Sequence, residues 1–178
     1  MSLLVKHAPK QRIKKYTPDL LITMFRKAAM LRNEMIEAGF TDNGGAIHSA
    51  ERILNLLGLA LNYPGLSHIN NLRHFSEAIF SVEAWKLHQE GNKVLIEHVS
   101  PVRHLTQMVI GEIASGADDN KLTEFVKEHY KLVLLSPAET RILNKQNRSK
   151  VSIDRLSCAG IELATRPTSS DIQQCIQP

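Results

Sequence analysis

Apolar residues recur at steps of three and four positions through the first half of the chain, which is the spacing of one face of an α-helix. A first helix is predicted over 18–37, because Thr17 and Pro18 supply an N-cap and a proline at the first helical position. The same spacing predicts a second helix over 47–61 and a third over 68–89. The N-terminal half is therefore expected to be helical.

The pattern changes after Asn92, where short runs of apolar β-forming residues alternate with helical stretches. The expected elements are strands over 93–99 and 132–135, helices over 101–115, 119–129 and 137–147, and a third short strand over 160–163. The long crossover between the two main strands allows either parallel or antiparallel pairing. The predicted fold class is α+β and mainly helical, with a helical N-terminal half followed by a small sheet with crossing helices.

The composition of the two ends completes the expected organisation. The first 16 residues hold five basic side chains and no acid, whereas the last residues are rich in Thr, Ser, Pro and Gln. The predicted parts are a basic flexible arm over 1–16, a helical subdomain over 17–91, a strand–helix–helix–strand–helix subdomain over 92–164, and a flexible tail over 165–178.

The excess positive charge of the chain lies in the arm. Five of the 22 lysines and arginines lie in the arm, and the rest of the chain contains the other 17 together with all 18 acidic residues. Basic arms of this kind often contact nucleic-acid phosphates, and a solvated start of the chain is the alternative interpretation. The predicted nucleic-acid-binding residues of the arm are Lys6, Lys10, Arg12, Lys14 and Lys15.

Composition excludes several classes of protein. The chain has 178 residues, of which 43% are hydrophobic and 22% charged, as is ordinary for a globular protein in solution. No apolar run approaches the ~20 residues that cross a membrane, so no membrane contact is expected. Two cysteines make no disulfide framework, and cytoplasmic localisation is expected. The motifs of zinc proteases, esterases, P-loop hydrolases and dinucleotide-binding proteins are missing from the sequence.

Glu97 and His98 are the clearest candidates for chemistry, because they stand where the first predicted strand gives way to a helix. Ser100 is expected to cap that helix, with Pro101 at its first position. His98 is predicted to act as a general base with Glu97 beside it, although neighbours on a strand point to opposite faces. Arg103 would help the helix N-terminus to attract an anion. The alternative is a histidine that bonds only to local backbone.

Basic residues also gather towards the C-terminus. Four of them are predicted to contact a phosphate backbone, or else to complement the dipole at a helix C-terminus: Arg141, Lys145, Arg148 and Lys150. Glu139 stands three residues after Ser136, so it is expected to complete a capping box. Arg155 is grouped with Arg103 as a residue that would stabilise charge on a reacting phosphate. The candidate catalytic residues are thus Glu97, His98, Arg103 and Arg155.

The run from Ile96 to Pro101, followed by the 132–135 strand and a helix with Asn144, resembles the skeleton of the His-Asn-His endonucleases. In that family an acid–histidine pair precedes an apolar residue and proline, and a later strand and helix complete a ββα-metal site. The resemblance covers residues 93–147. It implies that His98 is a general base and that Glu97 or Asn144 faces a divalent metal.

The sequence is compatible with two functions. One is a nucleic-acid-binding enzyme, an endonuclease or ribonuclease-like phosphodiesterase. The other is a non-enzymatic helical binding or regulatory module that acts through protein–protein contacts. The four candidate catalytic residues would converge in one cleft in the enzyme and lie apart in the module. A homodimer through the helical half is also expected, because Met24, Met30, Met35 and the leucines offer more apolar surface than one small core needs.

Overall fold

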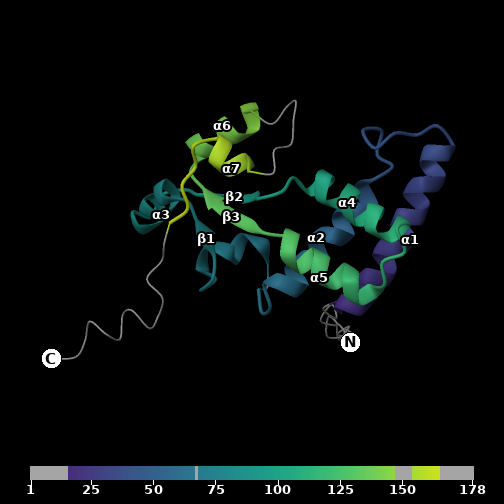
Figure 1. Cartoon of the computed structure of the whole chain (residues 1–178). Helices are drawn as coiled ribbons and strands as arrows, with labels where there is room; N and C mark the ends of the chain where they lie inside the picture. The colour runs from purple at the N-terminus through teal and green to yellow at the C-terminus, as the bar shows by residue number, and fades with distance from the viewer. Residues whose placement is uncertain (1–15, 67, 147–153, 165–178) are drawn as a thin grey trace, which may run out of the picture.

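Four helices pack together at one end of the molecule (Figure 1). The computed structural model describes residues 16–66, 68–146 and 154–164. In it the four helices are α1 (Pro18–Glu37), α2 (His48–Asn62), α4 (Val102–Ala114) and α5 (Asp119–His129). The predicted start of α1 is confirmed, because Thr17 Oγ1 accepts a hydrogen bond from the backbone N–H of Leu20 at 3.3 Å.

A small mixed sheet continues from this helical end. Its central strand is β3 (Leu132–Leu135), which pairs antiparallel with β2 (Leu95–His98) and parallel with β1 (Ile79–Phe80). All four residues of β3 are fully buried, as expected for a continuous apolar run covered on both faces. The two main predicted strands are confirmed, and their pairing is antiparallel. The mainly helical α+β fold class is confirmed with them.

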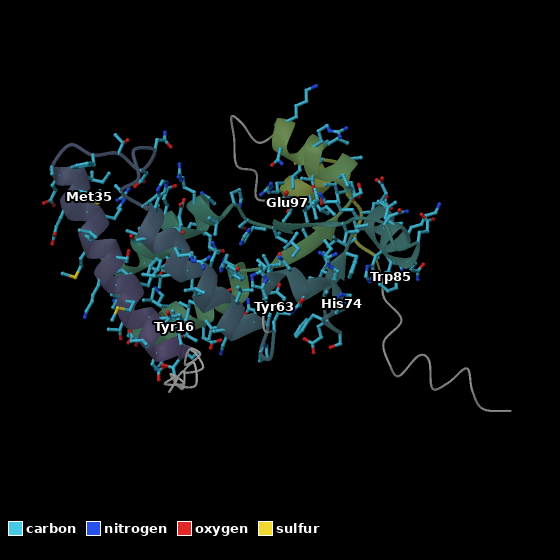
Figure 2. All side chains as sticks on the ribbon, turned by 180° about the vertical axis from the view of Figure 1, so that it is seen from behind. Tyr16, Met35, Tyr63, His74, Trp85 and Glu97 are labelled. Atoms are coloured by element: carbon cyan, nitrogen blue, oxygen red, sulfur yellow. The ribbon has the colours of Figure 1, made fainter. Side chains whose placement is uncertain are left out.

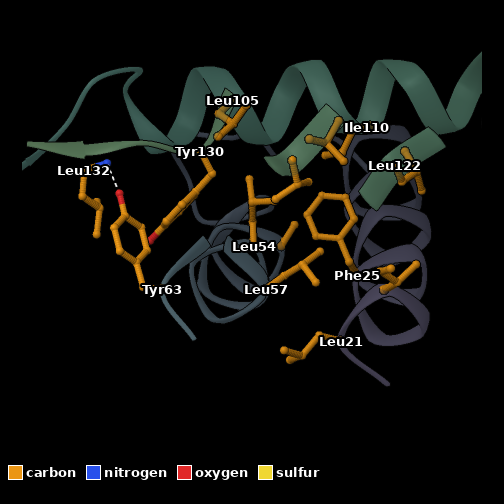
Figure 3. Close-up of a cluster of buried hydrophobic side chains, with 14 of the residues drawn as sticks. Leu21, Phe25, Leu54, Leu57, Tyr63, Leu105, Ile110, Leu122, Tyr130 and Leu132 are labelled. Carbon is orange, nitrogen blue, oxygen red and sulfur yellow. Dashed lines mark hydrogen bonds between the residues drawn. The ribbon is translucent and has the colours of Figure 1, made fainter. Parts of the chain in front are cut away.

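The sheet separates two hydrophobic cores. Leu132 and Leu134 face the larger core, where Phe25 of α1 and Leu54 of α2 meet side chains of α4 and α5 (Figure 3). Val133 and Leu135 alternate with them and face a smaller core. That smaller core is covered by α6 (Pro137–Gln146) and α7 (Arg155–Cys158), which lie on the opposite side of the sheet from α2 and α5 (Figure 1). The larger core draws residues from both of the predicted subdomains.

The single helix predicted over 68–89 is wrong. The segment holds a 3₁₀-helix η1 (Ile69–His74), the short strand β1, and the helix α3 (Val82–Gln89). Ser81 ends the extended stretch, because its hydroxyl caps α3 by accepting from Ala84 N at 3.0 Å. Phe80 and its neighbours satisfy their backbone groups in the sheet, so pairing with β3 overrides the helical spacing of the apolar residues.

Two smaller predictions also need correction. The helix α4 begins at Val102, with Pro101 as its N-cap instead of Ser100, because Pro101 has an extended ψ of 132° and its carbonyl accepts the first helical hydrogen bond, from Leu105. The short strand expected over 160–163 is only a single antiparallel bridge between Leu163 and Ser81. The capping box of α6 is confirmed, since Glu139 and Ser136 bond each other's backbone N–H.

Candidate functional site

Glu97 and His98 stand at the end of β2 and point to opposite faces of the sheet. His98 pairs with Leu132, which faces the larger core, and Glu97 pairs with Val133, which faces the smaller one. His98 is therefore on the side of α2, whereas Glu97 is on the side of α6 and α7, where Figure 2 labels it. Although Glu97 and His98 are adjacent in the sequence, their side chains therefore lie on opposite sides of the sheet.

His98 is fixed by a polar contact with α2. Its Nε2 lies 2.9 Å from Oδ1 of Asn55, and the hydroxyl of Tyr130 donates to the same oxygen at 3.2 Å. The rings of His98 and Tyr130 meet edge to face, with centroids 5.4 Å apart. Burial, and to a lesser degree the positive charge of Arg155, lower the pKa of His98 to about 4. The imidazole is therefore neutral at neutral pH, with Nε2 as a hydrogen-bond donor to Asn55.

Tyr130 can reach this position because Gly58 has no side chain. A Cβ at Gly58 would lie 2.2 Å from Cγ of the Tyr130 ring, so the ring packs directly on the backbone of α2. Burial raises the pKa of Tyr130. Beside it, the hydroxyl of Tyr63 accepts a hydrogen bond from the backbone N–H of Leu132 at 2.8 Å, drawn as the dashed line in Figure 3. This cluster attaches the start of β3 to α2.

On the other face of the sheet, Glu97 lies near Arg155. Burial raises the pKa of Glu97, and the guanidinium of Arg155 opposes that shift. Arg155 is only 6% exposed and its Nη1 donates to the carbonyl of His98 at 3.1 Å. Burial lowers the pKa of Arg155, and Glu97 opposes that shift. Arg155 therefore attaches α7 to the end of β2, while its buried Nε has no partner among the described residues.

Arg103 belongs to a separate polar network at the N-terminal end of α2. Its Nε donates to Glu51 Oε1 and its Nη1 to Asn43 Oδ1, each at 2.8 Å. The neighbouring Asp42 accepts two hydrogen bonds from Arg32, which lower the pKa of that carboxyl. These contacts hold the loop between α1 and α2 against α4. Arg103 is thus engaged in a structural ion pair.

The four candidate catalytic residues lie in three separate environments. His98 and Arg103 bond to positions 55 and 51 of α2, which are one turn apart on the same helix face, while Glu97 and Arg155 lie on the far side of the sheet. Glu97 and Arg155 share one face of the sheet and interact electrostatically, but the structure does not bring all four residues into one cleft. A hollow of about 480 Å³ beside Tyr63, Lys127 and Tyr130 is lined by none of the four.

Other predicted site residues are exposed or lie outside the described residues. Arg141, Lys145 and Asn144 are exposed on α6. The remaining basic residues fall outside the described ranges: Lys6, Lys10, Arg12, Lys14, Lys15, Arg148 and Lys150. Across residues 16–66, 68–146 and 154–164, no group of three acidic, histidine or cysteine side chains could hold a metal ion.

Sequence reasoning missed the residues that fix the site. Asn55 and Gly58 stand on one face of α2, but neither residue type has a distinctive signal within a helix. Ser81 was also missed, although a serine just before a helix is an ordinary cap signal. Its hydroxyl donates to Glu139 Oε2 at 2.6 Å, so Glu139 serves both its capping box and a tertiary contact.

Among the described residues, no helix is both long and apolar enough to span a bilayer. No family model matches the sequence, and neither the curated proteins nor the solved structures contain a match to it.

Proposed function

We propose that this chain is a non-enzymatic helical module that acts through protein–protein contacts made by the outer face of α1. The observation that carries the proposal is the apolar surface on that face. Met30 is 62% exposed and Leu31 is 49% exposed, although a surface helix normally turns polar residues away from its core. Apolar side chains that no described residue covers are typical of a contact surface.

The arrangement of the polar residues supports the same function. His98 uses Nε2 to bond Asn55, and a base with a pKa of about 4 accepts a proton poorly from a substrate at neutral pH. Arg103 is held by Glu51 and Asn43. In this proposal the end of β2 has a structural role: His98 attaches it to α2, and Arg155 attaches it to α7.

A nucleic-acid enzyme is the second candidate, and one observation favours it. Burial raises the pKa of Glu97, and this carboxyl shares its face of the sheet with Arg155, a cation able to hold a phosphate. The exposed Arg141 and Lys145 and the basic arm would then bind the nucleic-acid backbone. This candidate includes the ribonuclease-like and endonuclease functions expected from the sequence.

A hydrolysis assay separates the two candidates. Purified full-length protein is incubated with single- and double-stranded RNA and DNA, with and without Mg²⁺, beside the variants Glu97→Gln, His98→Gln and Arg155→Lys. We expect no hydrolysis above the buffer control in any sample. Hydrolysis by the wild-type protein that falls by roughly 10²–10⁴-fold in a variant with an unchanged circular dichroism spectrum would overturn the proposal and assign the catalytic role.

A further inference from the structure

We infer that the outer face of α1 binds the same face of a second copy of this chain, with the two α1 helices antiparallel about a twofold axis between Met30 and Leu31. This inference rests on the proposed function and names its partner. A closed twofold pair uses the same surface on both copies, so one helix face is sufficient to build it.

The face is a single stripe along α1. Lys27, Met30, Leu31 and Glu34 follow one another at steps of three, one and three, which places them on one side of the helix. The buried residues of α1 lie on the opposite side: Leu21, Ile22, Phe25, Ala28 and Ala29. The helix forms the outer edge of the molecule in Figure 1, and Figure 2 labels Tyr16 just before its start and Met35 near its far end.

Exposed apolar side chains also stand at the two ends of this helix. Leu20 near the start is 43% exposed, and Phe40 just beyond the end is 54% exposed. With 20 residues, α1 is about 30 Å long, which gives two antiparallel helices a contact of several turns. Leu20 of one copy is then directed towards the end of the helix where Phe40 of the other copy lies.

The charges on the stripe select the antiparallel orientation. Lys27 and Glu34 are exposed, and the ion pairs of the described residues include neither of them, whereas Arg26 and Arg32 on the same helix are paired with Asp119 and Asp42. Positions 27 and 34 are equally far from the midpoint between 30 and 31. An antiparallel pair therefore sets Lys27 opposite Glu34 twice, whereas a parallel pair in register would set like charges opposite each other.

The test is analytical ultracentrifugation of the full-length chain from about 0.1 to about 100 µM, a range that detects micromolar association. We expect the mass to rise from 20.0 kDa to twice that value. Lys27→Glu and Glu34→Lys should each weaken the dimer roughly tenfold or more, because each replaces two ion pairs by two like-charge contacts. The matched controls Lys86→Glu and Glu83→Lys, at exposed positions of α3, should associate like the wild type.

A mixture of the two single variants gives the sharpest result. In the mixed pair, two glutamates of one chain face two lysines of the other, so this heterodimer should form more tightly than either variant alone. A chain that stays monomeric at all concentrations, or a dimer that neither substitution weakens, would overturn the inference. The hydrolysis assay does not depend on association, so the two proposals can fail separately. If the protein stays monomeric and hydrolyses no nucleic acid, a second copy is not the partner, but the proposed non-enzymatic function still stands.

Discussion

Gly58 is the residue on which the packing of Tyr130 against α2 depends. Because a Cβ at this position would lie 2.2 Å from Cγ of the ring, Gly58→Ala forces the ring and β3 to shift. We expect a loss of about 2–3 kcal/mol in the free energy of unfolding, measured with urea. The control is Gly111→Ala in α4, where nothing lies within 4 Å of the new Cβ and alanine should stabilise the helix by about 0.5–1 kcal/mol. Equal effects of the two substitutions would contradict the packing described here.

His98 makes stability depend on pH. Its pKa of about 4 in the folded chain lies below the ordinary 6.5, so the unfolded chain binds a proton first as the pH falls. The contribution of His98 to the free energy of unfolding is fully present above pH 6.5 and is lost as the pH falls from 6.5 towards 4. We expect the titration of His98 to lower the free energy of unfolding by about 2 kcal/mol between pH 7 and pH 5.

Urea unfolding at these two pH values compares the wild type with His98→Gln, which cannot titrate. The free energy of unfolding should fall by about 2 kcal/mol more in the wild type than in the variant over this pH interval. An identical loss in both proteins would show that His98 titrates normally and is not buried against Asn55 and Tyr130.

Only part of the site could be predicted at the scale of residues. Strand alternation predicted that Glu97 and His98 would point to opposite faces, and the structure agrees. Their partners could not be predicted, because Asn55 is 43 positions from His98 and Arg155 is 57 positions from it. No spacing rule covers contacts between such distant segments.

At the scale of elements, predictions succeeded where local signals bound a helix and failed where a segment pairs with a distant strand. The bounds expected for α1 and α5 match the structure, in which Thr17 and Asp118 cap the two helices. The helix predicted over 68–89 failed, because Leu72, Phe75 and Ile79 have helical spacing but face different cores. Only the position of β3, which is distant in the sequence, makes Ile79 part of a strand.

Ser81 links three elements and gives a test at this scale. Its hydroxyl caps α3, donates to Glu139 at the start of α6, and stands directly after β1. Ser81→Ala removes a helix cap and leaves the buried Glu139 with one donor fewer, so it should cost about 2–3 kcal/mol of unfolding free energy. Thr17→Ala, which removes only an exposed cap, should cost about 1 kcal/mol. A Ser81 variant no less stable than the Thr17 variant would rule out the tertiary link.

At the scale of the whole molecule, one larger core joins both halves of the chain. Its members come from α1 and α2 as well as from α4, α5 and β3. Residues on both sides of the change of pattern near Asn92 therefore share one core. The sequence could not show this, because a helical apolar face does not specify which other face it meets. The outer side of α1 stays outside this core.

In our proposal this outer side of α1 is a contact surface for a second copy. Oxidation by hydrogen peroxide, followed residue by residue with mass spectrometry, tests this contact most directly. Met30 is 62% exposed on the face, and the half-buried Met108 on α4 is the internal reference. We expect oxidation of Met30 relative to Met108 to slow several-fold as the protein concentration rises through the dissociation constant, because the dimer covers Met30. A ratio that stays the same at every concentration would contradict the claim.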